Sequence, residues 1–76
     1  MPHHNCQFIE TRLRHAEIRL NQIRTNITSY EQYLQTHPGH LPTIALLAEL
    51  RKLEKPQENE VSRLQSELDN CKAQNN

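Results

Sequence analysis

The chain has 76 residues, nine of them basic and nine acidic, so its formal net charge is zero. A chain this short forms one domain at most, and the balanced charge argues against a protein whose overall field draws it to nucleic acid or anionic lipid. Hydrophobic residues make up only 34% of the chain, which is too few for a compact globule and enough for a narrow apolar seam between helices.

Residues 6–36 carry apolar side chains at alternating spacings of three and four, which is typical of an amphipathic helix with a coiled-coil seam. The seam positions are Cys6, Ile9, Leu13, Ala16, Leu20, Ile23, Ile27, Tyr30 and Leu34. No glycine or proline interrupts the run, and Asn5 suits the N-cap position. The pattern therefore predicts one helix over 6–36.

The segment THPGHLP, residues 36–42, contains the only glycine and two of the four prolines. It predicts a chain reversal at Pro38-Gly39, within a turn over 37–41. Pro42 suits the first turn of a following helix, where its missing N–H costs nothing. His37 and His40 flank the reversal, and as polar residues at a loop tip they require no special role.

After the turn the three-four spacing resumes and predicts a second helix over 42–73. Its seam positions are Thr43, Leu47, Leu50, Glu54, Gln57, Val61, Leu64, Leu68 and Cys71. Pro56 removes one backbone hydrogen bond and crowds the carbonyl of Lys52, and the seam is polar beside it. We therefore expect the second helix to be kinked or broken within 52–56.

The two seams match if the chain folds back on itself, because residues level with each other then have numbers that sum to 77. Cys6 lies level with Cys71, and Leu13 lies level with Leu64. The same reversal brings opposite charges together at the flanks in the pairs Arg12–Glu67, Arg19–Glu60, Arg24–Glu58 and Glu31–Arg51. We predict an all-α, antiparallel two-helix hairpin that oligomerises into a helical bundle. Exchange of helices between two protomers would produce the same layers and stays open.

Cys6 and Cys71 lie level at the open end of the hairpin, so they either form a disulfide or remain two reduced, buried thiols. No secretory signal precedes them, which favours a reducing, cytoplasmic location by default, whereas a bridge would indicate an oxidising compartment.

His3 and His4 could complete a zinc set with the two cysteines, but the spacing matches no recognised ligand pattern and we expect no metal.

Catalytic signatures are absent from the sequence: there is no glycine-rich phosphate loop, no H-E-x-x-H and no nucleophile elbow. A two-helix hairpin also offers no deep, water-excluding pocket. We therefore expect neither an enzyme nor a cofactor or small-molecule substrate. We also expect no membrane-spanning helix, because no apolar run approaches the roughly 20 residues that span a membrane.

One side of the first helix carries an aromatic ring among basic and amide side chains. Phe8 could stack on a base while Arg12 and Arg19 contact RNA phosphates, and His15 lies on the same stripe. This layout resembles the small plasmid-encoded RNA-binding hairpins that dimerise into four-helix bundles. The alternative is that Arg12 and Arg19 are occupied by Glu67 and Glu60.

A second apolar set lies near the turn and is not used by the seam: Tyr33, Ile44, Leu46 and Leu53. Uncovered apolar side chains gathered at one end favour a partner surface. The alternative is that the kink at Pro56 rotates Leu46 and Leu53 inward.

The segment HPGHLPTIALLAEL resembles the Pro-x-x-x-Pro turn and the alanine-leucine helix of type III secretion needle subunits, and it is compatible with their small hairpin co-chaperones. The polar KAQNN end departs from the apolar C-terminus of the needle subunits.

These patterns together predict a small helical module that binds another protein or a second copy through Tyr33, Ile44, Leu46 and Leu53, acting as an assembly factor, co-chaperone, adaptor or inhibitor. The alternative is a dimeric RNA-binding regulator that uses Phe8, Arg12, His15 and Arg19.

Overall fold

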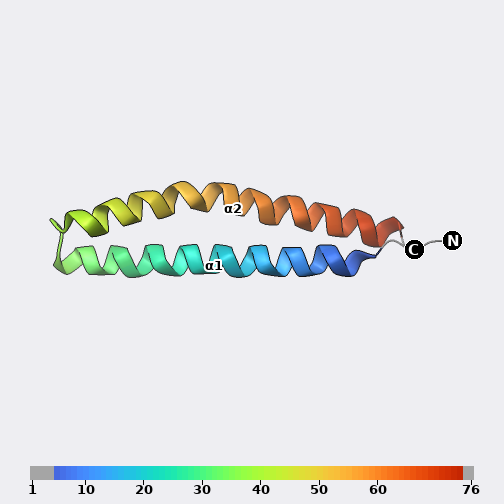
Figure 1. The fold of residues 1–76 in the computed structure, drawn as a ribbon, viewed down its shortest axis with the longest axis horizontal. Helices are drawn as coiled ribbons and strands as arrows, with labels where there is room; N and C mark the ends of the chain where they lie inside the picture. The colour runs from blue at the N-terminus through green and yellow to red at the C-terminus, as the bar shows by residue number, and fades with distance from the viewer. Residues whose placement is uncertain (1–4, 75–76) are drawn as a thin grey trace.

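The computed structural model describes residues 5–74 as two long antiparallel α-helices that lie side by side (Figure 1). Helix α1 spans Cys6–Thr36 and helix α2 spans Leu41–Gln74. The hairpin measures 62 × 14 × 13 Å, so it is a rod only two helices thick. The predicted all-α antiparallel hairpin is confirmed.

Local hydrogen bonds explain where the helices begin and end. The side chain of Asn5 accepts a hydrogen bond of 3.1 Å from the Gln7 N–H, as expected of an N-cap. Helix α1 ends where the His37 N–H donates to the Tyr33 carbonyl at 3.0 Å, and the Ile44 N–H donates to the His40 carbonyl at 3.1 Å to open α2. The turn therefore occupies 37–40, and α2 begins one residue before the expected position.

The two seams pack against each other in two apolar clusters. Toward the open end, the buried residues are Leu13, Ala16, Leu64 and Leu68, with Cys6, Ile9 and Val61 packed against them. Toward the turn, they are Ile23, Ile27 and Leu47, with Tyr30, Leu34 and Leu50 against them. Leu64 is the most deeply buried, with 1% of its surface exposed. Both clusters join residues that the register places at the same level.

Between the clusters the seam of α2 is polar, and Pro56 lies there on the exposed side. Of the two expected outcomes, a kink or a break, the break does not occur: α2 is helical without interruption from Leu41 to Gln74, with Pro56 inside it. The helix instead bows, and its middle stands farther from α1 than its two ends do (Figure 1). An outward bow lets the Lys52 carbonyl tilt toward water, so the proline bends the helix without ending it. The Gln57 side chain joins the helices at this level by donating to the Ala16 carbonyl at 3.1 Å.

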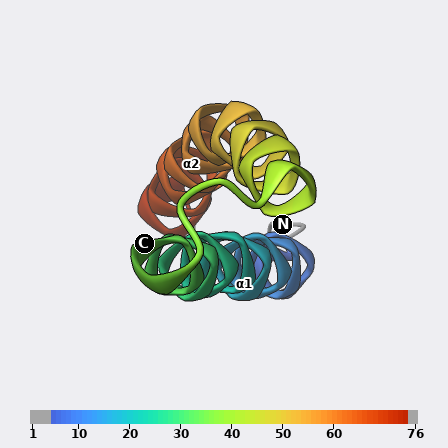
Figure 2. The ribbon, with the colours of Figure 1, turned by 90° about the vertical axis from the view of Figure 1, so that its left-hand side faces the viewer.

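The helices also wrap around each other. Seen along the rod from the turn, α1 and α2 slant in opposite directions (Figure 2). A seam that repeats every seven residues drifts by about 20° per heptad around a straight helix, so two such seams stay in contact only if the helices supercoil.

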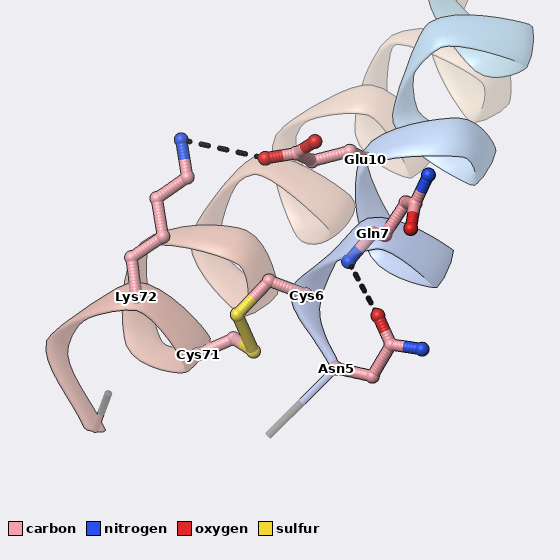
Figure 3. Close-up of a disulfide and its surroundings, with 6 residues drawn as sticks. All are labelled: Asn5, Cys6, Gln7, Glu10, Cys71 and Lys72. Atoms are coloured by element: carbon pink, nitrogen blue, oxygen red, sulfur yellow. Dashed lines mark hydrogen bonds and ion pairs between the residues drawn. A yellow bond between two sulfur atoms is a disulfide. The ribbon is translucent and has the colours of Figure 1, made fainter. Parts of the chain in front are cut away.

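A disulfide joins the helices at the open end. Cys6 and Cys71 are bonded through their sulfur atoms, and their Cα atoms lie 5.9 Å apart, within the usual range for a bridge (Figure 3). Beside it, the Lys72 Nζ lies 3.8 Å from a Glu10 carboxylate oxygen. Of the two alternatives for the cysteines, the bridge is the one that the structure contains. Within residues 5–74, neither helix carries a stretch long and apolar enough to cross a membrane.

Replacing both Cys6 and Cys71 by serine should lower the free energy of unfolding by about 4 kcal/mol, because the bridge closes a loop of 65 residues and removes that loop entropy from the unfolded chain. Urea unfolding followed by circular dichroism measures the effect. Reductant should reproduce it in the native protein and leave the double-serine variant unchanged. Equal unfolding midpoints with and without reductant would contradict a stabilising bridge.

Gly39 provides a second prediction, because the turn does not depend on its special backbone freedom. Its φ is not positive, and a Cβ atom added there would meet nothing within 4 Å. Gly39→Ala should therefore raise the free energy of unfolding by about 0.4–1 kcal/mol, through a less disordered unfolded chain. The same urea experiment measures it, and a clear loss of stability would show that the turn requires glycine.

Candidate interaction surface

Ion pairs between the helices lie along one side of the hairpin. The Arg24 guanidinium donates to Glu54 at 2.9 Å and to Glu58 at 2.6 Å, and Arg51 donates to Glu31 at 2.7 Å. The Lys72–Glu10 contact continues the same side toward the open end. The predicted Arg24–Glu58 and Glu31–Arg51 pairs are confirmed. We name this side the ion-paired flank; it comprises Glu10, Glu17, Arg24 and Glu31 of α1 with Ile44, Arg51, Glu58, Gln65 and Lys72 of α2.

The opposite side differs, because the ion pairs predicted there do not form. Arg63 binds both carboxylates from within α2: it donates to Glu67 at 2.7 Å and also to Glu60. Partners three and four residues apart on one helix are immediate neighbours, so Arg63 reaches them more readily than an arginine on α1 does. The expected Arg12–Glu67 and Arg19–Glu60 pairs are therefore wrong.

Arg12 and Arg19 of α1 are therefore available for other contacts. The Arg12 guanidinium lies 5.8 Å from the centre of the Phe8 ring, a cation–π distance. Within residues 5–74, the Arg19 side chain makes no ion pair and no hydrogen bond.

This second side is organised in heptads, since residues seven apart stay on the same side of a helix. One column on α1 contains Arg12, Arg19, Asn26 and Tyr33, and one on α2 contains Leu46, Leu53, Glu60 and Glu67. We name these eight residues the open flank. In the antiparallel register they form four rows: Arg12 with Glu67, Arg19 with Glu60, Asn26 with Leu53, and Tyr33 with Leu46. The rows near the open end are charged and those near the turn are largely apolar.

The apolar rows face solvent. Leu46 is 50% and Leu53 is 51% exposed, so the bow in α2 does not turn them inward. Leu53 lies at the edge of an open groove of about 480 Å³ between the helices. The α1 side of that groove consists of His15, Ile18, Arg19, Gln22, Ile23 and Asn26.

The structure brings together candidate residues that the sequence assigned to competing sites. Tyr33, Leu46 and Leu53 from the predicted protein-binding set lie on the same side as Arg12 and Arg19 from the RNA-binding set. Phe8 and His15 form the next column on α1, since they too lie seven residues apart. The two alternatives therefore concern one face of the molecule.

Ile44 does not belong to that face. It is two residues from Leu46, which places it about 200° away around the helix, on the other side of the buried Thr43 and Leu47. Ile44 is 40% exposed, and its heptad column continues through Arg51 on the ion-paired flank. The predicted set was chosen by closeness along the chain, whereas the helix divides it between two flanks.

The two turn histidines contact Tyr33, which the sequence did not indicate. The His37 ring stacks on Tyr33 with centroids 4.2 Å apart, and His40 meets it edge-on at 5.4 Å. The His40 Nδ1 also lies 2.7 Å from the Thr43 hydroxyl. The four-residue spacing of Tyr33 and His37 was the available signal for this stacking. The histidines thus order the turn, and Tyr33 keeps 40% of its surface exposed.

The suggested zinc set cannot form as proposed, because the bridge occupies the sulfur atoms of Cys6 and Cys71. His3 and His4 lie outside the described residues. Across residues 5–74, no group of three or more histidine, cysteine or carboxylate side chains is arranged to hold a metal ion.

Comparison with protein-family models, with curated proteins and with solved structures found no match to this chain. The geometry of the two flanks is therefore what bears on function.

Proposed function

We propose that the protein is a non-enzymatic helical interaction module that presents its open flank to a helix of a partner protein or to a second copy of itself. The observation that supports this is the difference between its two sides. Ion pairs join the helices along one flank, whereas on the other, within residues 5–74, no ion pair crosses between the helices and two large apolar side chains are half exposed.

The open flank suits a helical partner because of its shape and periodicity. Leu46 and Leu53 lie one heptad apart on α2, and Tyr33 of α1 lies in the same row as Leu46, so the apolar rows follow the spacing at which a third helix presents its own apolar residues. Covering the remaining surface of Leu46 and Leu53 would contribute about 1 kcal/mol each, since each is already half buried. The groove beside Leu53 would accept a side chain from that helix.

A module of this kind acts through its surface and requires no reactive group. The ion-paired flank keeps the two helices in register, and the bridge fixes their open end. A rigid pair of helices loses little conformational entropy on binding, which favours affinity. The role is that of an assembly factor, adaptor, co-chaperone or inhibitor.

Site-specific photo-cross-linking tests the proposal. A benzophenone amino acid at Leu46 should form discrete covalent adducts with a protein, and the same probe at Gln65, on the ion-paired flank, should not. Adding Leu53→Asp to the Leu46 probe variant should reduce the adducts at least about tenfold, because a carboxylate would be buried at the interface. Adding Ile44→Asp instead is the matched control and should leave them unchanged. Equal adducts from both probe positions, or none from either, would contradict the proposal.

A second candidate function, RNA binding, is supported by the cation–π contact of Arg12 with Phe8 and by the unpaired guanidinium of Arg19. An aromatic ring beside one cation, with a second cation about two helical turns farther along the same side, is an arrangement that can bind single-stranded RNA by stacking and phosphate contacts. It occupies the charged half of the open flank and the column next to it.

This second candidate predicts that the protein raises the fluorescence anisotropy of a labelled single-stranded RNA and that added salt weakens the binding. Arg12→Ala combined with Arg19→Ala should then abolish the signal. Arg24→Ala combined with Arg51→Ala removes the same charge from the ion-paired flank and should leave RNA binding nearly intact. Equal losses from the two double variants would indicate only a nonspecific effect of charge.

A further inference from the structure

We propose that the partner of the open flank is a second copy of this chain, joined through that flank with the turns of both copies at the same end. This inference rests on the proposed function and identifies its partner. It follows from how the four rows of the open flank would meet under the two possible symmetries.

In the first arrangement the two-fold axis runs parallel to the rod. Each row then meets the same row of the other copy, and α1 of one copy lies opposite α2 of the other. Arg12 meets Glu67 of the second copy, and Arg19 meets Glu60 of the second copy. At the turn end, Tyr33 meets Leu46 of the second copy. Opposite charges meet in both charged rows, and apolar surface meets apolar surface.

In the second arrangement the two-fold axis crosses the rod, and the turns lie at opposite ends. With the axis at the centre of the flank, Arg12 would meet Tyr33 of the second copy and Glu67 would meet Leu46 of the second copy. The Glu67 carboxylate would then be desolvated against leucine, with no cation from the second copy to compensate for it. Charge complementarity therefore selects the arrangement with both turns at one end.

The contacts within a single copy leave this pairing available. Arg12 and Arg19 have no carboxylate partner in residues 5–74, while Glu60 and Glu67 share one cation, Arg63. The Arg63 side chain is 48% exposed, and Glu60 and Glu67 are 38% and 44% exposed. Pairs so exposed contribute little on their own, so each carboxylate can accept an arginine of the second copy in addition.

The row formed by Asn26 and Leu53 is the least complementary, and the groove lies at that level. Leu53 of the second copy would point toward the space bounded by Ile23, Gln22 and Asn26. Two hairpins joined in this way form a four-helix bundle in which every neighbouring pair of helices is antiparallel, as in up-and-down bundles. The bundle would also enlarge a core that is thin in a single hairpin.

Sedimentation equilibrium of the oxidised native protein, up to about 0.1 mM, should show a mass twice that of the 9.0 kDa chain. Arg19→Glu alone places like charges together at two symmetric contacts, and so does Glu60→Arg alone. Each should raise the dimer dissociation constant at least about tenfold. Glu17→Arg, on the ion-paired flank, is the matched control and should leave that constant unchanged.

Mixing the two variants supplies the decisive result. In a mixed dimer, the Arg19→Glu chain and the Glu60→Arg chain present opposite charges at both contacts, so an equimolar mixture should regain the native affinity. Mixing would not restore a dimer that was lost because either chain misfolds. It would also not restore one lost because Glu60→Arg removes an ion-pair partner of Arg63. A native dimer whose variants do not recover on mixing would overturn the same-end arrangement.

A monomeric native protein would overturn the second copy as partner. The proposed function would still stand if photo-cross-linking at Leu46 captured a different protein, so the two failures are distinguishable.

Discussion

The single apolar seam between α1 and α2 is the constraint on which the rest of the structure depends. Each helix buries one narrow stripe, and the buried side chains fall into two clusters separated by a polar level at Gln57. A core of this size is only marginally stabilising on its own. The disulfide at the open end and the stacked rings at the turn therefore supply the contacts that the seam lacks.

A two-helix rod necessarily leaves two flanks, and this chain treats them differently. Exposed ion pairs contribute only about 0–1 kcal/mol each, so those along Arg24 and Arg51 specify register more than they stabilise the fold. Arg12 and Arg19 could have formed ion pairs across the open flank with Glu67 and Glu60. Arg63 competes for both of these carboxylates from within α2. One intrahelical residue thus leaves Arg12 and Arg19 free and makes the two sides unequal.

Much of the fold could be predicted from the sequence, because a seven-residue pattern is a long signal that many residues share. The register and the level positions of Cys6 and Cys71 followed from it, and the Asn5 cap followed from the preference of asparagine for the position before a helix. Features governed by small energy differences were harder to predict. The choice of Glu67 between Arg12 and Arg63 is one example, and whether Pro56 would kink α2 or break it is another. The division of the exposed apolar set between two flanks was missed for a different reason, because closeness along a helix does not mean a shared face.

The polar level in the seam also explains where the open groove lies. Pro56 and Gln57 stand level with residues 21 and 20 of α1, within the stretch of α1 from His15 to Asn26 that lines the groove. An apolar residue in place of Gln57 would draw the helices together, and an alanine in place of Pro56 would straighten α2. The sequence instead keeps two residues that weaken the hairpin at this level. The middle of α2 stands farther from α1 there than the two ends do (Figure 1), and Leu53 and Ile23 border the groove in the same part of the hairpin. The polar layer of the seam and the open groove thus coincide, because the helices are separated most where the seam is least apolar.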